Sequence, residues 1–194
     1  MTDQASILII DVNHARAAII QDGLREAGHV HVRWLNETSN LLRHIADIDP
    51  DVIIIDLESP NRDVLEQMFQ VSRLVKRPVA MFVDQSDATA MQDAMVAGVS
   101  AYVVDGLRKD RVKPILDMCI LRFNVFSRLQ DELHEAKTAL ADRKVIERAK
   151  GIIMKQRGFT EEEAFRALRN LAMEKNKKLG EIARQVISIS SLLG

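Results

Sequence analysis

Cysteine is almost absent from this chain of 194 residues, and long apolar runs are missing. The single cysteine, Cys119, excludes an internal disulfide and any zinc site built from several cysteines, which suits a reducing compartment. No apolar run approaches the ~20 residues that a membrane-spanning helix needs. The first residues, MTDQASILII, lack the basic and apolar regions of a secretion signal. We therefore expect a cytoplasmic protein with no membrane partner, and the 47% hydrophobic content is ample for packed cores.

Sequence signatures of catalysis and of metal binding are missing as well. The chain has no glycine-rich phosphate loop, no nucleophile elbow and no HExxH motif. Its five histidines form no ligand-spaced cluster beyond His29 and His31. We expect no enzyme, no catalytic residues and no resident cofactor.

Net charge is nearly zero overall but is unevenly distributed along the chain. The formal charge of the whole chain is -1. Residues 1–110 carry 10 basic and 17 acidic side chains, whereas residues 140–194 carry 12 basic and 7 acidic ones. An acidic body with a basic tail is the asymmetry expected when only the tail meets a polyanion.

Five short aliphatic runs in the first 110 residues predict buried β-strands. They lie at residues 7–10, 30–34, 52–55, 78–83 and 101–104. Amphipathic stretches separate the runs, and two of these stretches end at Gly28 and Gly98, which suit the position just after a helix. Strands that alternate with helices predict an α/β fold with a five-stranded parallel sheet.

A three-four spacing of mostly apolar residues then runs from Val112 to Arg143. This heptad pattern predicts a long helix in which Val112 to Phe126 covers the sheet and the remainder pairs with another helix. We therefore expect a coiled-coil-like connection and a homodimer formed through residues 112–143. The positions of the pattern are Val112, Ile115, Cys119, Arg122, Phe126, Leu129, Leu133, Ala136, Leu140 and Arg143, and the two arginines weaken it or mark its end.

The tail is predicted to form three helices. The first continues to Gln156 and stops at Gly158, the second is capped by a box of Thr160 and Glu163, and the third begins near Leu179. Because short helices bury little alone, their apolar faces must converge and leave the charged faces outside. Phe165 is placed in this core, so we do not expect aromatic stacking to dominate ligand recognition by the tail.

Acidic residues directly follow four of the predicted strands: Asp11, Asp56, Asp84 and Asp105. The carboxyl ends of parallel strands form the functional edge of an open α/β sheet. Several carboxylates on one edge must bind a cation, accept a phosphoryl group with a cation's help, or hold protons through mutual repulsion.

Residues 5 to about 122 resemble the receiver domain of response regulators, which has a flavodoxin-like fold. The runs that carry the resemblance are ILIID, VIIID, MFVD and AYVVD. The resemblance implies that Asp56 corresponds to the phosphoryl acceptor and Asp11 to one acid of a magnesium-binding pair. The sequence departs from the family pattern at Val12, Val83 and Asp105, which replace the second acid, a hydroxyl residue and a lysine.

These departures predict an inefficient acceptor site. An acidic pocket of Asp11, Asp56 and Asp105 lacks the hydroxyl and ammonium groups that neutralise a phosphoryl group, and it could at most bind Mg²⁺ weakly at Asp11 and Asp56. We expect a receiver-like domain, residues 1–122, that serves as a dock. The alternative is a response regulator that is activated by phosphorylation and binds DNA, which the depleted acceptor site disfavours.

The tail, residues 143–194, resembles the ANTAR domain, the RNA-binding module of antitermination regulators of the AmiR and NasR type. The resemblance rests on residues 147–187, ERAKGIIMKQRGFTEEEAFRALRNLAMEKNKKLGEIARQVI. It implies that the tail binds paired stem-loops in leader mRNA and prevents a terminator hairpin from forming. The expected RNA-binding residues are Arg143, Lys144, Arg148, Lys150, Gly151, Lys155, Arg157, Arg169, Lys177 and Lys178.

Basic side chains and one glycine supply the physical reasons for this set. Phosphates attract lysine and arginine, so RNA affinity should depend strongly on salt. Gly151 costs ~1 kcal/mol relative to alanine inside a helix, which indicates either close approach of a nucleotide or tight packing between helices. The alternative is that these basic side chains form a solvated helix face whose charge is balanced by nearby acids. The protein would then be a protein-interaction adaptor that binds no nucleic acid.

A depleted receiver followed by an ANTAR tail is most similar to the NasT-type regulators of nitrate and nitrite assimilation. The resemblance implies a partner protein, a nitrate sensor of the NasS type, that sequesters the regulator until its ligand binds. Residues 123–142 would form the connecting coiled-coil helix.

Overall fold

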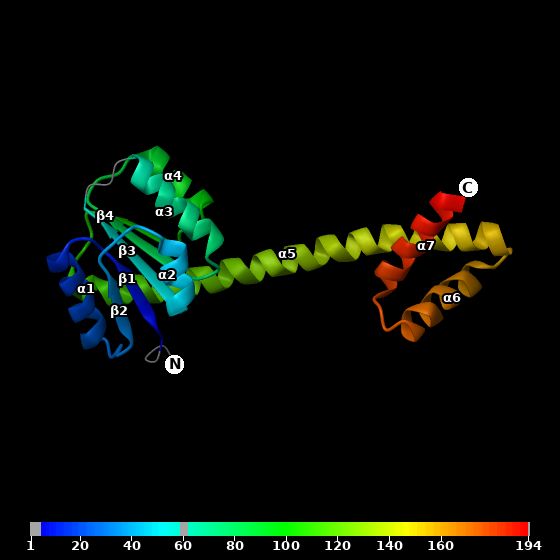
Figure 1. The fold of residues 1–194 in the computed structure, drawn as a ribbon, viewed down its shortest axis with the longest axis horizontal. Coiled ribbons are helices and arrows are strands. Elements are labelled where there is room, and N and C mark those ends of the chain that lie inside the picture. Colours follow the sequence, from blue (N-terminus) through cyan, green and yellow to red (C-terminus); the bar gives the residue numbers. More distant parts are fainter. Residues whose placement is uncertain (1–4, 59–61, 194) are drawn as a thin grey trace. The chain divides into compact units, whose positions relative to one another are not determined.

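The computed structural model describes residues 5–58 and 62–193 (Figure 1). The first four residues of the expected receiver-like domain and the last residue of the expected tail therefore lie outside the described residues. The chain divides into two compact units, residues 1–127 and 128–194. Among the helices of the described residues, none is both long and apolar enough to cross a bilayer.

The first unit is built on a five-stranded parallel sheet with the strand order β2-β1-β3-β4-β5, which confirms the expected fold. The second strand begins two residues later than expected, because Val30 is 75% exposed and the pairing with β1 starts at Val32. The strands are β1 (Ile7–Ile10), β2 (Val32–Leu35), β3 (Val52–Leu57), β4 (Val79–Val83) and β5 (Ala101–Val104).

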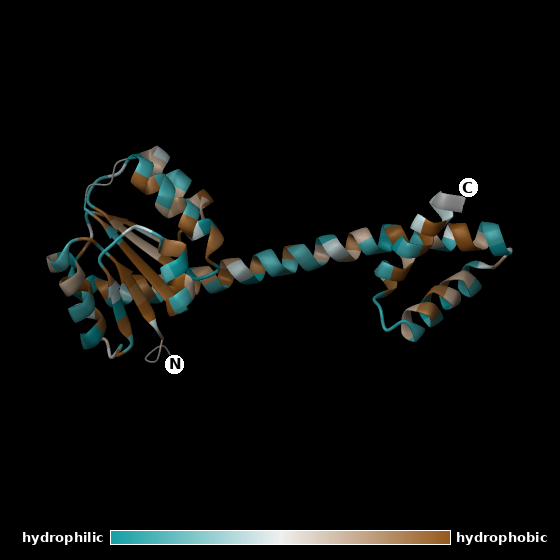
Figure 2. Ribbon diagram, in the orientation of Figure 1, coloured by the Kyte–Doolittle hydropathy of each residue, from teal (hydrophilic) through white to brown (hydrophobic). Residues whose placement is uncertain are grey.

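Helices cover both faces of this sheet. One face packs against α1 (His14–Glu26) and the beginning of α5 (Lys109–Arg157), and the other packs against α2 (Leu41–Ile48), α3 (Arg62–Leu74) and α4 (Ala88–Val96). Because side chains alternate along a strand, Ile7 and Ile9 face α1 and α5 while Leu8 and Ile10 face the other helices. The central strands β1, β3 and β4 are accordingly buried and mostly hydrophobic, whereas the edge strand β2 carries the exposed Arg33 (Figure 2). Gly28 and Gly98 take positive φ values of 91° and 85°, as expected for residues that follow a helix.

Gly23 allows α1 to pack directly against the start of α5. A Cβ atom at this position would lie 2.8 Å from the backbone oxygen of Lys109 and 3.1 Å from the Cβ of Val112. The contact is reinforced by an ion pair between Lys109 and Glu26, whose charged atoms are 2.6 Å apart.

α5 is one continuous helix of 49 residues, and its apolar residues have two different environments. Val112, Leu116 and Cys119 are buried in the sheet core. Leu129 and Leu133, further along, are 56% and 48% exposed. The expected succession from a sheet-covering segment to an exposed apolar segment is therefore present, but the covering segment ends near Ile120 and not at Phe126, which is 59% exposed.

The second unit combines the end of α5 with α6 (Glu161–Glu174) and α7 (Leu179–Leu193). Its core contains Ala149, Leu168, Ala172, Ile182 and Ala183, so the three apolar faces converge as expected. The capping box is confirmed, since the Thr160 side chain accepts from the Glu163 backbone N–H and the Glu163 carboxylate accepts from the Thr160 N–H. The start of α7 packs closely on α5. A Cβ atom added at Gly180 would overlap the carboxylate of Asp142, so glycine permits this close approach.

Gly23→Ala is expected to destabilise the first unit by about 1–3 kcal/mol, because the added methyl group must displace a backbone carbonyl. Urea denaturation followed by circular dichroism measures the change. Gly151→Ala is the matched control: no atom lies within 4 Å of an added Cβ there, so helix propensity predicts a gain of ~1 kcal/mol. Equal effects of the two substitutions would contradict the close contact between α1 and α5.

Candidate functional site

The carboxyl edge of the sheet places an arginine among aspartates. Asn13 caps α1, and its side-chain oxygen accepts hydrogen bonds from the backbone N–H groups of Ala15 at 3.0 Å and Arg16 at 3.4 Å. This cap starts the helix directly after β1. Arg16 lies in the first turn, where it reaches the ends of two other strands.

Arg16 binds two carboxylates at once. Its Nε donates to Oδ2 of Asp56 at 2.8 Å and its Nη2 donates to Oδ1 of the same residue at 2.7 Å. Its Nη1 lies 2.8 Å from Oδ1 of Asp84, which follows β4. The hydrogen bond to Asp56 raises the pKa of Arg16 above its ordinary value, so the guanidinium is a permanent cation here. We call Arg16, Asp56 and Asp84 the Arg16 cluster.

The Arg16 cluster occupies the carboxylate oxygens that a phosphoryl acceptor would need. Asp56 is 1% exposed and both of its carboxylate oxygens are bound by Arg16. An attack by Asp56 on a phosphoryl group would require Arg16 to withdraw first.

Magnesium does not fit this arrangement. Mg²⁺ requires nearly octahedral oxygen ligands, and the oxygens of Asp56 already receive a guanidinium. Val12, where a second acid would stand, is 68% exposed. Within residues 5–58 and 62–193, no group of three or more His, Cys, Asp or Glu side chains is arranged to hold a metal ion.

Asp11 lies beside the Arg16 cluster and is 3% exposed. Its Oδ1 accepts from the backbone N–H of Asn13 at 2.7 Å, and its Oδ2 is a buried oxygen without a hydrogen-bond partner. Burial raises the pKa of Asp11 from 3.8 to about 6; the Asn13 hydrogen bond opposes this, and the nearby charge of Asp56 adds to it. The backbone oxygen of Asp11 also accepts from the indole Nε1 of Trp34 at 2.8 Å, which ties the end of β1 to β2.

Asp105 departs from the expected acidic pocket. It is exposed and takes a left-handed backbone conformation with φ 47°. Among the described residues, no hydrogen bond or ion pair links it to Asp11 or Asp56, and Asp84 takes the place beside Asp56 instead. Sequence reasoning missed Arg16, although a cation in the first turn after Asp11 was a usable signal.

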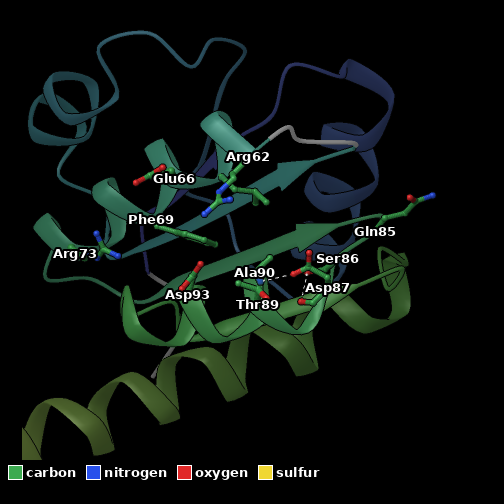
Figure 3. A pocket seen from close by; sticks show the side chains of 11 residues that line it. Arg62, Glu66, Phe69, Arg73, Gln85, Ser86, Asp87, Thr89, Ala90 and Asp93 are labelled. Carbon is green, nitrogen blue, oxygen red and sulfur yellow. Dashed lines mark hydrogen bonds between the residues drawn. The ribbon is translucent and has the colours of Figure 1, made fainter.

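A cavity of about 630 Å³ lies between α3 and α4, and its lining includes Gln85, which follows Asp84 of the Arg16 cluster directly in the chain. Figure 3 shows Phe69, Arg62 and Glu66 extending from α3, with Asp93 on α4 facing them. At its edge, Ser86 is hydrogen-bonded to the hydroxyl of Tyr102 on β5 at 2.9 Å. The lining contains both positive and negative groups around an aromatic ring, which suits a polypeptide segment better than a polyanion.

In the second unit, Lys150 differs from the expected RNA-binding set. It is 7% exposed, and its Nζ lies 2.8 Å from Glu147 and 2.7 Å from Glu161. Hydrogen bonds to these two carboxylates raise the pKa of Lys150. Lys150 therefore links α5 to the first turn of α6 and is not an exposed cation, in contrast to the rest of the expected RNA-binding set.

The other cations of the set are exposed. Within the described part of the chain, the structure gives no side-chain hydrogen bond or ion pair to any of them. They are Arg143, Lys144, Arg148, Lys155 and Arg157 on α5, Arg169 on α6, and Lys177 and Lys178 in the loop before α7. Gly151 is exposed, with no atom within 4 Å of an added Cβ, so packing between helices of this chain does not explain it.

The aromatic residues of this unit also differ from expectation. Phe165 is 41% exposed and lies outside the core in which we placed it. Phe159, in the loop before α6, is a second aromatic side chain of the tail and is half-buried. Stacking on a base is therefore available to this unit at Phe165.

Residues 7–117 match the response regulator receiver domain, so the chain belongs to the response regulator receiver family. Residues 134–187 match the ANTAR domain. The chain thus combines a receiver domain with a C-terminal ANTAR domain, and both of these are regulatory rather than catalytic.

Two relatives share most of this chain. The transcriptional regulatory protein PdtaR of Mycobacterium tuberculosis is 26% identical over 84% of this chain and 80% of its own length. The nitrate regulatory protein of Klebsiella oxytoca is 29% identical over 97% of this chain and 41% of its own length.

Solved structures agree on the fold of the first unit. The receiver domain of a diguanylate cyclase from Desulfovibrio desulfuricans is 18% identical, with a TM-score of 0.52 over 63% of this chain and 98% of that one. A chemotaxis response regulator of Vibrio cholerae is also 18% identical, with a TM-score of 0.51 over 60% of this chain and 98% of that one.

Asp11→Asn is expected to stabilise the first unit at pH 7.5 by about 1–2 kcal/mol. Because the folded-state pKa of Asp11 is raised, the folded protein holds this proton more tightly, and stability falls as the pH rises from about 4 to 6. The asparagine mimics the protonated acid and removes this loss. Thermal unfolding of both proteins between pH 4 and 8 measures the effect. A stability gain that is the same at every pH would contradict the assignment of the titration to Asp11.

Proposed function

We propose that this chain is an RNA-binding transcription antitermination regulator. Its ANTAR domain would bind stem-loops of leader mRNA, and its receiver domain would control when this happens. The observation that carries the proposal is the uncompensated positive charge of the second unit, on the region that matches the ANTAR domain.

This charge argues against an adaptor that binds no nucleic acid. Residues 140–194 contain 12 lysines and arginines. Among the described residues, Lys150 and Arg184 are the two of these that form ion pairs, with Glu147 and Glu161 and with Asp142. Ten cations without an ion-pair partner form a surface suited to a phosphate backbone.

The Arg16 cluster argues against activation by phosphorylation. The acceptor-like Asp56 is buried and doubly bound by Arg16, so control by a docking partner fits the geometry better. We propose that the partner is a nitrate sensor of the NasS type and that the regulated process is nitrate and nitrite assimilation. The similarity to a nitrate regulatory protein over 97% of this chain supports this assignment. The cavity between α3 and α4 is the candidate docking place, because its mixed charges suit a polypeptide.

We further propose that the chain forms a homodimer through the 112–143 part of α5. Phe126, Leu129, Leu133 and Leu140 recur at three-four or heptad spacing and are each about half exposed. Burying such a row against its copy would remove its apolar surface from water.

Arg157→Glu is expected to lower the affinity for stem-loop RNA about tenfold, because a phosphate contact becomes a repulsion. Lys137→Glu is the matched control on the same helix, outside the expected set. The measurement is retention of cellular RNA after crosslinking to the purified protein, followed by sequencing and titration at two salt concentrations. Affinity that does not change with salt, or equal losses in the two variants, would refute the proposal. Lys150→Glu is a poor test, since it places a third acid beside Glu147 and Glu161 and threatens the fold.

Leu133→Lys is expected to convert the dimer to a monomer, because a charge is introduced into the apolar row of α5. Light scattering of the full-length protein measures the mass. Glu135→Lys, two residues away on another side of the helix, should leave the mass of the dimer unchanged. A mass that is the same for wild type and Leu133→Lys would remove this interface.

A further inference from the structure

The second unit contains a cavity of about 430 Å³ between α5 and α7. The helix α5 supplies Lys144, Val145 and Arg148 to its lining, and α7 supplies Arg184, Ile187 and Ser188. Cavities of this size fall in the range that holds small ligands. None of the expected ANTAR residues on α6 or in the loop before α7 takes part.

The lining divides into an apolar part and a positively charged part. Val145 and Ile187 are partly buried and pack on the core of the unit, so they form an aliphatic floor. Three cations, Lys144, Arg148 and Arg184, stand around it and are exposed. An occupant that satisfies both parts must carry a flat or apolar body next to negative charge.

The three cations are not equivalent. Arg184 is held by an ion pair to Asp142, which fixes its guanidinium beside the cavity. Lys144 and Arg148 have no hydrogen-bond or ion-pair partner within the described residues, so their charges are available to a ligand. They lie four residues apart on α5, about 5–6 Å between Cβ atoms, so both can reach the same phosphate or its neighbour.

We propose that this cavity receives one unpaired nucleotide of an RNA loop, with the base on Val145 and Ile187 and the phosphates on Lys144 and Arg148. Bases that leave a stack are held elsewhere between apolar side chains, and single-stranded RNA is read mainly at such bases. The Ser188 hydroxyl can donate to or accept from the edge of the base. The inference rests on the proposed function and adds to it the place where a loop base is recognised.

The test fills the cavity without changing its charge. Ser188 is exposed, and Ser188→Phe places an aromatic ring in the space that the base would take. Asn170→Phe adds the same bulk to an exposed position of α6, which contributes nothing to the cavity. Circular dichroism confirms that both variants are folded.

The probe is a pool of hairpins with one fixed stem and a randomised loop, from which the full-length protein selects its preferred hairpin. Each loop position of that hairpin is then replaced in turn by an abasic nucleotide. For wild type and Asn170→Phe we expect one position at which the abasic replacement weakens binding about tenfold. For Ser188→Phe we expect about tenfold weaker binding of the intact hairpin and no further loss at that same position.

The variant Arg148→Gln distinguishes the effect of losing a positive charge from the effect of filling the cavity. This variant should weaken binding of every hairpin alike and lower the slope of log affinity against log salt by about one. If Ser188→Phe binds the hairpin like wild type, the cavity does not hold a base. The same conclusion follows if the loss of affinity in Ser188→Phe adds to the loss at every abasic position. In both cases the proposal of RNA binding itself stands. If the wild-type protein retains no hairpin even at low salt, both this inference and the proposed function are overturned.

Discussion

The ion pair between Arg16 and Asp56 determines what the first unit can do. It joins the first turn of α1 to the end of β3, and its second carboxylate partner, Asp84, extends it to β4. The Asp56 side chain is fully buried and the Arg16 side chain is 17% exposed. Removing one member of such a pair leaves an uncompensated buried charge, which typically costs about 3–5 kcal/mol. The pair is therefore a constraint on the fold as well as a block on the acceptor position.

The same constraint explains the state of Asp11. A guanidinium has one planar fork, and Asp56 and Asp84 occupy it in this structure. Asp11 is left with one oxygen bound to the Asn13 N–H and one buried oxygen without a partner. A proton on that oxygen would supply the missing donor toward Asp56. At this edge of the sheet one arginine therefore balances part of the negative charge, and the burial of Asp11 raises its pKa to about 6.

The fold could be predicted well from the sequence because its signals are local and periodic. Aliphatic runs located the five strands, Gly28 and Gly98 located two helix ends, and the pair of Thr160 and Glu163 located the start of α6. The site was less predictable, because its partners are far apart in the chain. Arg16 and Asp56 are 40 residues apart, and the only indication that they meet is the place of a cation in the first turn after Asp11. Asp105 was placed with Asp11 by its position after a strand, but its left-handed backbone turns it toward solvent.

The basic tail also shows what the sequence alone could not predict, namely which of its cations are paired inside the fold. In the sequence, Lys144, Arg148 and Lys150 look alike as members of one cationic run. Burial separates them: Lys150 is compensated by Glu147 and Glu161 and stabilises the contact between α5 and α6, while Lys144 and Arg148 keep free charges beside a cavity. An ion pair that is consumed inside the fold contributes no counterion release on binding RNA, whereas an unpaired surface cation does. The cations that the fold does not pair, such as Lys144 and Arg148, are therefore the ones we propose for RNA binding, whereas Arg184 on α7 is held by Asp142 and shapes the cavity beside them.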